Sequence, residues 1–398
     1  MSSNDWEQRK LVDLVDRVTR KNQDLVSELP LTISAQYGLI DQNEFFDKRV
    51  ASKDVSGYYL IENGEFAYNK STSTDAPWGA IKRLDRYKNG VLSTLYIVFG
   101  IKENNPVDSD FLVSYYSTNL WHKGIHEIAA EGARNHGLLN IAPADFFETK
   151  LMIPQDIEEQ KKIGKYFEEL ERLITLHQRK CEETKTLKKY MLQKMFPQNG
   201  HSVPEIRFSG FTEDWEQRKF ADFTWDAGKR NKEDLDLEPY AITNEHGFIR
   251  QRDAHDDFGY MKDTDRKAYN IVQPNSFAYN PARINVGSIG YYKGVENVIV
   301  SSLYEVFQTD NYVNDRFLWH WLKSDEFPRW IEKLQEGSVR LYFYYDKLCE
   351  CQLYMPSLEE QEKIATFLDD LDHLITLHQH KCEELQNIKK FMLKNMFI

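Results

Sequence analysis

The chain has 398 residues and a formal net charge of −12, and 41% of its residues are hydrophobic. This length and composition predict two or three domains with substantial cores. The acidic balance argues against a protein that coats itself in nucleic acid, because phosphate contacts come from Lys and Arg. No apolar run reaches membrane length and the N-terminal residues are polar, so we expect no signal peptide, no membrane contact and a cytoplasmic location.

The first predicted element is a globular segment, residues 1–152. It opens with the hexapeptide Asp-Trp-Glu-Gln-Arg-Lys at Asp5–Lys10. The alternating run Leu92–Phe99 is typical of a strand, and Asp110–Leu120 is typical of a helix. Strands clustered in the middle of the segment, followed by a helix, indicate a mixed domain.

A long helix is predicted next, over residues 153–197. Its apolar residues recur at alternating steps of four and three, with charged residues between them, which is the pattern of a coiled-coil seam. A helix of roughly 40 residues, at about 1.5 Å per residue, is a rod on the order of 60 Å long and needs a partner along its length. The residues expected to pair are Ile163, Phe167, Leu170, Ile174 and His177.

The second half of the chain repeats the first. After a linker predicted for residues 198–213, a second globular segment, residues 214–354, opens with the same hexapeptide at Asp214–Lys219. This segment has its own strand run, Val298–Phe307, and its own helix, Asp315–Lys323. Whole halves of the chain are therefore duplicated.

A second long helix is predicted for residues 355–398, and about half of its positions are identical to those of the first helix. Two copies of one helix can pair about a pseudo-twofold axis if they run antiparallel. The fold class expected is α+β, with two tandem mixed domains of twisted, mainly antiparallel sheets, joined by two helices in an antiparallel coiled coil. The alternative is two unrelated amphipathic helices on separate cores. The pairing residues of the second helix are Ile364, Leu368, Leu371, Ile375 and His378.

Between the repeated stretches the two halves differ almost completely, as expected for two readers of different ligands on one framework. Basic residues and tyrosines are interleaved in these variable stretches. Arg can pair with a guanine edge, Asn or Gln with adenine, and Lys with phosphate. For any single residue, an ordinary solvated charge is an equally good interpretation. The DNA-binding candidates are Lys70, Lys82, Arg83, Arg86, Arg134, Asn135, Arg250, Arg252, Arg283, Asn285, Ser288, Lys293, Arg340 and Tyr342.

No catalytic or metal-binding constellation is predicted. The sequence lacks a phosphate-binding GxxxxGK[ST] loop, and Asn280-Pro281 lacks the second Pro and the aromatic residue of a methyltransferase loop. His122 and His126 stand four apart without a third ligand nearby. The four cysteines are expected to be reduced and structural.

The doubled arrangement resembles the specificity subunits of type I restriction-modification systems. The resemblance lies in the two hexapeptides and in the helix entries, which read Pro-Gln-Asp-Ile-Glu-Glu-Gln-Lys-Lys-Ile from Pro154 and Pro-Ser-Leu-Glu-Glu-Gln-Glu-Lys-Ile from Pro356. It covers essentially the whole chain. One departure is the segment before Asp214, which has no counterpart before Asp5.

The resemblance implies a non-catalytic chain whose two globular segments are target recognition domains, each reading one half of a bipartite target in double-stranded DNA. The helices would act as a spacer and as the docking surface for two methylation subunits, and two restriction subunits would complete the complex. S-adenosylmethionine, ATP and Mg²⁺ would be held by those partners, with no cofactor in this chain.

Two other classes of function compete with this one. A protein-interaction scaffold without DNA specificity is favoured by the acidic charge, whereas the paired Arg-rich variable stretches argue against it. An enzyme with an unusual site in one half is the third possibility, and no convergent constellation supports it.

Overall fold

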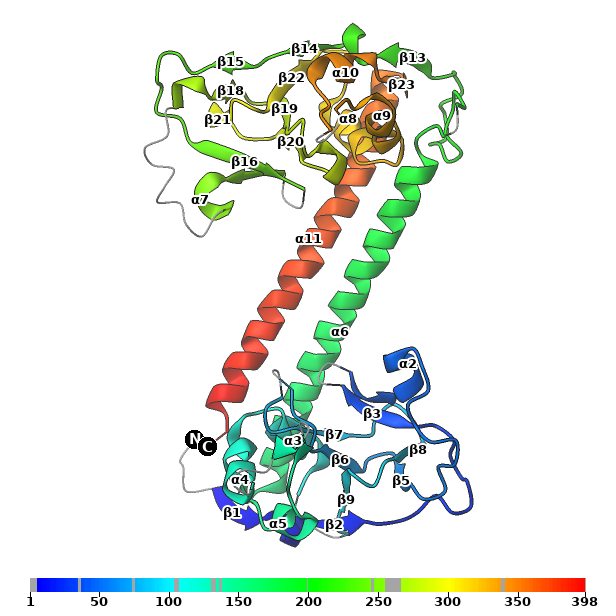
Figure 1. The fold of residues 1–398 in the computed structure, drawn as a ribbon, viewed down its shortest axis with the longest axis vertical. Helices are drawn as coiled ribbons and strands as arrows, with labels where there is room; N and C mark the ends of the chain where they lie inside the picture. The colour runs from blue at the N-terminus through cyan, green and yellow to red at the C-terminus, as the bar shows by residue number, and fades with distance from the viewer. Residues whose placement is uncertain are drawn as a thin grey trace. The chain divides into compact units, whose positions relative to one another are not determined.

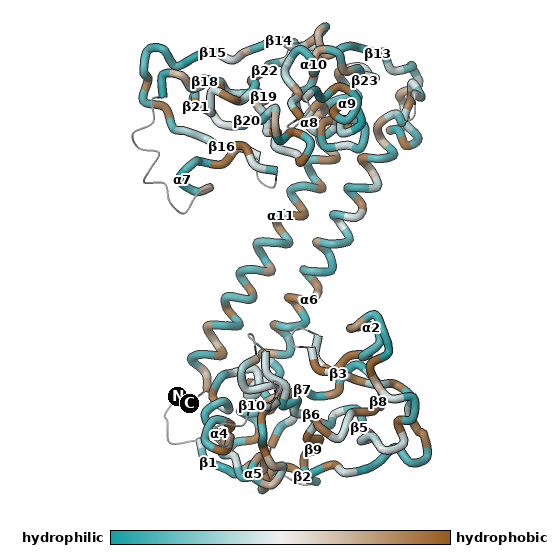
Figure 2. The backbone as a smooth tube through the Cα atoms, viewed as in Figure 1, coloured by the Kyte–Doolittle hydropathy of each residue, from teal (hydrophilic) through white to brown (hydrophobic). Residues whose placement is uncertain are grey.

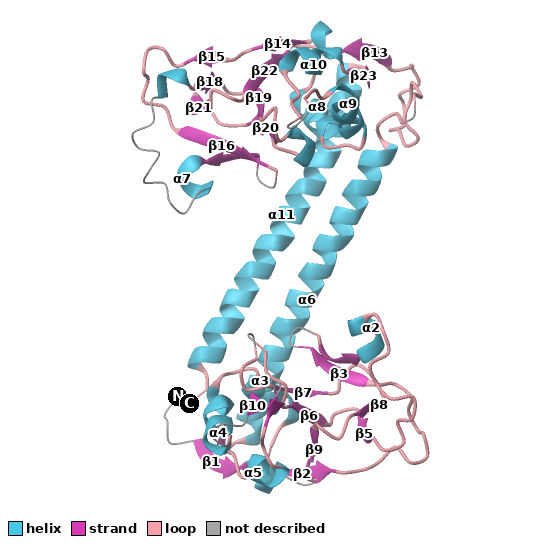
Figure 3. Cartoon of the chain, viewed as in Figure 1, coloured by secondary structure: helices cyan, strands magenta, loops and turns pink. Residues whose placement is uncertain are grey.

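The computed structural model describes residues 6–34, 37–73, 76–103, 107–129, 134–135, 138–198, 200–244, 247–254, 266–337 and 341–397. It divides into two compact units, which we call unit 1 (1–178 with 380–398) and unit 2 (179–379). Each unit contains one mixed domain and one part of each of two 38-residue helices, α6 (Ile157–Lys194) and α11 (Leu358–Asn395) (Figure 1). Figure 3 shows strands and helices mixed within each domain.

The domain of unit 1 is built on a four-stranded sheet in the order β2-β9-β6-β7. Four further strand pairs, β1–β12, β3–β4, β5–β8 and β10–β11, complete the domain, and the strand pairs described for this unit are antiparallel. The strands are β1 (Trp6–Lys10), β2 (Val15–Val18), β3 (Leu31–Ser34), β4 (Gly38–Asp41), β5 (Tyr59–Glu62), β6 (Phe66–Asn69), β7 (Ala80–Arg83), β8 (Asn89–Leu92), β9 (Ile97–Ile101), β10 (Arg134–Asn135), β11 (Leu138–Leu139) and β12 (Lys150–Pro154). The helices are α1 (Leu11–Leu14), α2 (Gln42–Phe46), α3 (Ser109–Tyr116), α4 (Leu120–Ile128) and α5 (Pro143–Phe147).

The domain of unit 2 has a matching four-stranded sheet, β14-β22-β19-β20, and a five-stranded sheet, β15-β18-β21-β16-β17. Strands β16 and β21 run parallel, and the other strand pairs described for this unit are antiparallel. The strands are β13 (Glu216–Lys219), β14 (Thr224–Asp226), β15 (Lys229–Arg230), β16 (Pro239–Thr243), β17 (Gly247–Arg250), β18 (Asn270–Val272), β19 (Ser276–Tyr279), β20 (Ile289–Tyr292), β21 (Val298–Val300), β22 (Glu305–Thr309) and β23 (Gln352–Met355). The helices are α7 (Gln251–Ala254), α8 (Asp315–Leu322), α9 (Glu326–Leu334), α10 (Tyr345–Glu350) and the 3-10 turns η2 (Phe220–Asp222), η4 (Arg266–Ala268) and η5 (Ile284–Val286).

The repeated stretches build equivalent parts of the two domains. The hexapeptide strands β1 and β13 pair with β12 and β23, which come just before the long helices. Phe66 stacks on Phe99 in unit 1, and Phe277 stacks on Phe307 in unit 2, with ring centroids 5.4 Å and 4.9 Å apart. The mixed α+β class and the mainly antiparallel sheets are confirmed.

Two strand predictions are wrong in detail. Leu92–Phe99 and Val298–Phe307 are not single strands, because each contains a turn between two strands of different sheets. In each case a serine carbonyl accepts a hydrogen bond within the turn. The Tyr96 amide donates to Ser93 and the Tyr304 amide donates to Ser301, both at 3.0 Å. Alternation on both sides of a short turn looks like one continuous strand in the sequence.

The two long helices run antiparallel within each unit. In unit 1, the thiol of Cys382 contacts the carbonyl oxygen of Ile174 at 3.6 Å, and Lys389 pairs with Glu171. In unit 2 the equivalent contacts are Cys181 with Ile375, at 3.9 Å, and Lys188 with Asp372, at 2.6 Å. In both units the residue number rises along one helix as it falls along the other, which confirms the antiparallel pairing. The four cysteines, Cys181, Cys349, Cys351 and Cys382, are free.

The predicted seam residues lie mostly where the pattern places them. Ile163, Phe167, Leu170 and Ile174 are buried in the core of unit 1, and Ile364, Leu368 and Leu371 are buried in that of unit 2. Ile375, His177 and His378 are only half-buried. The buried positions also contact the domain cores, so one apolar face of each helix serves both its partner helix and a domain.

A buried glutamine fixes the start of each long helix. The Gln160 side chain accepts the Asp108 amide and donates to the Pro154 carbonyl, both at 2.8 Å. Gln361 repeats this arrangement with the Asn314 amide, at 2.8 Å, and the Pro356 carbonyl, at 3.0 Å. The glutamine of the Glu-Glu-Gln motif therefore joins the long helix to the N-terminus of α3 or α8.

Replacing Gln160 by leucine is expected to lower the free energy of unfolding by about 1–3 kcal/mol, because the half-buried Asp108 amide and the buried Pro154 carbonyl lose their partner. Denaturant unfolding of the full chain checks this. Gln155, outside the described hydrogen bonds of this clamp, provides a matched Gln→Leu control, and an equal loss in both variants would contradict the assignment.

No described helix is both long enough and apolar enough to cross a bilayer.

Candidate nucleic-acid interface

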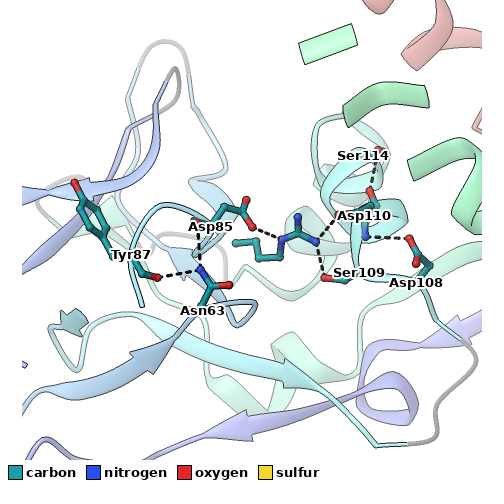
Figure 4. A network of polar contacts seen from close by, with 8 residues as sticks. Asn63, Asp85, Tyr87, Asp108, Ser109, Asp110 and Ser114 are labelled. Carbon is teal, nitrogen blue, oxygen red and sulfur yellow. Dashed lines mark hydrogen bonds and ion pairs between the residues drawn. The ribbon is translucent and has the colours of Figure 1, made fainter. Parts of the chain in front are cut away.

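The first predicted DNA contact, Arg83 on β7, is held in an acidic network of unit 1. Its guanidinium pairs with Asp85 at 2.6 Å and with Asp110 at 2.7 Å, and it donates to the Ser109 hydroxyl at 2.7 Å. Figure 4 shows this network between the turn after β7 and the first turn of α3. Burial opposes the charge, yet the two carboxylates raise the pKa of Arg83. These bonds attach β7 to α3, so the guanidinium already has protein partners.

Lys70 and Lys82 are half-buried lysines of the same unit. Burial lowers the pKa of both side chains, and nearby Lys389 lowers that of Lys82 further. The Lys70 ammonium donates to the Ile141 carbonyl at 3.4 Å. A nearby anion would favour the charged form of such a lysine and offset the effect of burial.

Arg86, Arg134 and Asn135 are the remaining candidates of unit 1. Arg86 is exposed, with its guanidinium 5.8 Å from the centre of the Tyr87 ring. Arg134 and Asn135 form β10, paired with β11, and their side chains lie outside the part of the chain that the structure describes.

In unit 2, Arg250 and Arg252 lie at the end of β17 and the start of α7. Both are exposed and weakly held, because Arg250 contacts the Tyr240 hydroxyl at 3.4 Å and Arg252 lies 3.7 Å from Glu238. Exposed guanidinium groups with such loose partners are available to a ligand.

The turn between β19 and β20 carries three further candidates. Arg283 and Asn285 are exposed, whereas Ser288 is buried and donates its hydroxyl proton to the Ile242 carbonyl at 2.8 Å. That bond connects two sheets of the domain and gives Ser288 a structural role. Lys293, just after β20, is exposed, and its pKa is lowered by partial burial and by Arg316.

The last two candidates follow α9. Arg340 lies outside the described residues. Tyr342 stacks face to face on Tyr344, with ring centroids 5.5 Å apart and planes 3° apart. Tyr344 is exposed and was not among the predicted residues. A pair of stacked tyrosines offers a flat apolar surface beside polar hydroxyl groups.

One buried polar cluster was also missed by the sequence reasoning. His320, Asp369 and Asp372 lie close enough to suggest a metal site. However, Asp372 pairs with Lys188 and Asp369 with Arg316, so cations of the protein already neutralise both carboxylates. Burial and these cations lower the pKa of His320 to about 3, and the neutral imidazole bonds Asp369 at 3.1 Å. The arrangement is a packed polar contact between α8 and α11.

Each domain thus combines a repeated framework with exposed cations that differ between the two halves. The family described as the type I restriction modification DNA specificity domain matches residues 4–186 and again residues 212–387. The chain belongs to this family.

Known proteins are similar to this chain along nearly its whole length. The specificity subunit of the type I restriction enzyme MjaVIII from Methanocaldococcus jannaschii is 22% identical over 410 residues, covering 97% of this chain and 90% of that protein. The crystal structure of the type I restriction-modification S subunit from M. genitalium shares the fold, with a TM-score of 0.62 and 14% identity over 100% of this chain and 98% of that one. The HsdS subunit from Thermoanaerobacter tengcongensis aligns over 99% and 97%, with a TM-score of 0.46 and 15% identity.

Proposed function

We propose that this specificity subunit gives a type I restriction-modification complex its DNA target, with each domain reading one half of a bipartite sequence in double-stranded DNA. The observation that carries the proposal is a common framework with different exposed turns. Strands β6 and β19 are equivalent. Asn69 ends β6 and Asn280 directly follows β19, but the sequences of the next residues share no pattern. Base-reading side chains must differ between half-sites, whereas the scaffold that presents them need not.

The side chains proposed to contact DNA are those whose polar or charged groups are at least partly exposed. In unit 2 these are Arg250, Arg252, Arg283, Asn285 and Lys293, and in unit 1 they are Arg86, Lys70 and Lys82. Arg134, Asn135, Arg340 and Tyr342 stay predictions of the same kind. Arg83 and Ser288 support the framework through their protein partners, so in the proposed function they position the residues around them.

The long helices are proposed to dock methylation subunits. Figure 2 shows hydrophobic residues spread among hydrophilic ones along both helices. Leu176 and Tyr190 on α6 are exposed, and so are their repeats Leu377 and Phe391 on α11. Exposed apolar residues at equivalent positions suit two copies of one partner subunit. Two restriction subunits would then complete the complex.

The helices are also proposed to set the number of base pairs between the half-sites, since a rigid rod fixes the separation of what it carries. We propose that the chain is non-catalytic and that S-adenosylmethionine, ATP and Mg²⁺ belong to its partners. A scaffold that binds only proteins is the alternative, and the different exposed arginines of the two domains favour DNA over it.

The proposal is tested by enriching a library of random DNA duplexes with the complex of this chain and its methylation subunit. We expect one sequence to emerge, made of two fixed segments separated by a constant number of unspecified base pairs. Binding without any sequence preference would contradict the proposal and favour the scaffold.

Exchanging residues Leu11–Leu151 for the equivalent segment of another family member is expected to change one fixed segment of that sequence completely. The other segment and the spacer should stay the same, because the domain of unit 2 is untouched. The enrichment experiment, repeated on the exchanged chain, checks this. The converse exchange, in the domain of unit 2, serves as the matched control and should change only the other segment.

A further inference from the structure

Each unit contains a basic groove at the same place in the repeat. In unit 1 the groove lies between the turn from α3 to α4, Ser117–Leu120, and the last turns of α11, with Lys389, Lys390 and Lys394 in its wall. In unit 2 it lies between Lys323–Asp325, in the turn from α8 to α9, and the last turns of α6, with Lys185, Lys188 and Lys189 in its wall.

The two grooves share one pair of lysines at equivalent positions of the repeat. Lys188 and Lys189 of α6 repeat as Lys389 and Lys390 of α11. The first lysine of each pair is half-buried and forms an ion pair across the helices, Lys188 with Asp372 and Lys389 with Glu171. The second lysine is exposed, and no ion pair is found for Lys189 or Lys390 within the described ranges. Lys188 and Lys389 therefore link the two helices, whereas Lys189 and Lys390 line the groove without an ion pair among the described residues.

Both grooves are positive in a chain whose net charge is −12. Among its described lining residues the groove of unit 1 has three lysines and the single carboxylate of Glu171, which is already paired with Lys389. The groove of unit 2 has four lysines and the carboxylate of Asp325, which accepts a bond from Gln193 at 2.8 Å. Two of these lysines are paired with acids, Lys185 with Glu182 and Lys188 with Asp372. The excess cations indicate an anionic ligand.

We propose that each groove binds a phosphate of the DNA backbone, with Lys390 in unit 1 and Lys189 in unit 2 as equivalent contacts. This inference rests on the proposed function and names part of the DNA surface outside the variable turns. A phosphate is the same in every sequence, so its contacts belong in the repeated framework, whereas base contacts belong in the parts that differ. Lys394 and Lys323 lie beside the two lysines and add charge to each groove.

Burial and neighbouring cations support the assignment. Lys323 lies in the wall of the unit 2 groove, and burial and Lys188 lower its pKa to about 8. A bound phosphate would offset this crowding of positive charge, since an anion favours the charged form of lysine. An acidic surface of a partner subunit is the competing ligand, and the experiment below separates the two.

The test uses the double variant Lys189→Gln with Lys390→Gln, in complex with the methylation subunit. Binding to a short duplex without the target sequence is measured between about 50 and 200 mM salt. Loss of two phosphate contacts should reduce the slope of log K against log salt by about 2, since each contact contributes about 0.9. Affinity for target and non-target duplexes should fall by the same factor. Lys162→Gln with Lys363→Gln, also an exposed repeated pair but outside both grooves, is the control and should leave the slope unchanged.

Two results would overturn the inference. An unchanged salt slope in the groove variant would exclude a phosphate contact at these lysines. Loss of the methylation subunit from the variant on size-exclusion chromatography would make the grooves a protein-docking surface instead. Failure of the proposed function would give a different result. The wild-type complex would then enrich no split sequence from the random library, although the salt dependence of its DNA binding could still be measured.

Discussion

Replacing Phe397 by alanine is expected to destabilise unit 1 by roughly 3–5 kcal/mol, the usual cost of removing a buried phenylalanine ring. The ring is buried at the end of α11, with centroids 5.6 Å from Phe111, 5.9 Å from Phe167 and 6.1 Å from Trp6. It thus joins α3, α6 and the hexapeptide strand β1. Trp6 and Phe111 also contact each other, with ring centroids 5.9 Å apart, so the cavity would open beside this contact.

The repeat supplies a matched variant. Phe196, at the end of α6, is fully buried in unit 2 and packs on Phe317 of α8 at 5.3 Å, beside Trp215. Phe196→Ala should therefore weaken unit 2 by a similar amount. Amide hydrogen exchange followed by mass spectrometry separates the two outcomes, since exchange should quicken in β1 and α3 for Phe397→Ala and in β13 and α8 for Phe196→Ala. Uniform faster exchange across the chain in either variant would show that the ring does not act on its own unit.

The long helices were easier to predict from the sequence than the domains. A helix of 38 residues repeats its seam many times, and about half of its positions recur unchanged in the second copy of the sequence. Its observed bounds, Ile157–Lys194 and Leu358–Asn395, fall inside the predicted 153–197 and 355–398. The sequence therefore contained enough information for the helices, their pairing and the doubling of the domains.

The roles of side chains within the domains depend on contacts between residues that are far apart in the sequence. Nothing near Arg83 indicates that Asp110, on α3, neutralises it. Ser288 looks like a polar residue of an exposed turn, yet it donates to Ile242, 46 residues away. Local pattern cannot distinguish a cation held by the protein from one left for a ligand. Comparing the two halves of the sequence gives more information about such cations. Lys188-Lys189 recurs as Lys389-Lys390, whereas most other charged residues of the two halves differ.

Lengthening both long helices by seven residues is expected to lengthen the spacer of the DNA target by about three base pairs. The insertions belong after Gln178 in α6 and after Gln379 in α11, where each helix passes from one unit into the other. Seven residues preserve the spacing of the seam and add about 10 Å of helix, and base pairs are about 3.4 Å apart. The contacts within each unit, such as Lys389 with Glu171 and Lys188 with Asp372, keep their partners because neither side of the insertion changes.

The enrichment of random duplexes again provides the measurement. Both fixed segments of the target should be retained, with only the number of unspecified base pairs between them increased. The same insertion in α6 alone is the control, because it offsets the seam of one helix against the other and should abolish the active complex. If the doubly lengthened chain still selected the original spacer in an active complex, the helices could not be the element that measures it. Spacer length would then have to come from the DNA contacts of the partner subunits, and the exposed residues Leu176, Tyr190, Leu377 and Phe391 would be the place to look for those partners.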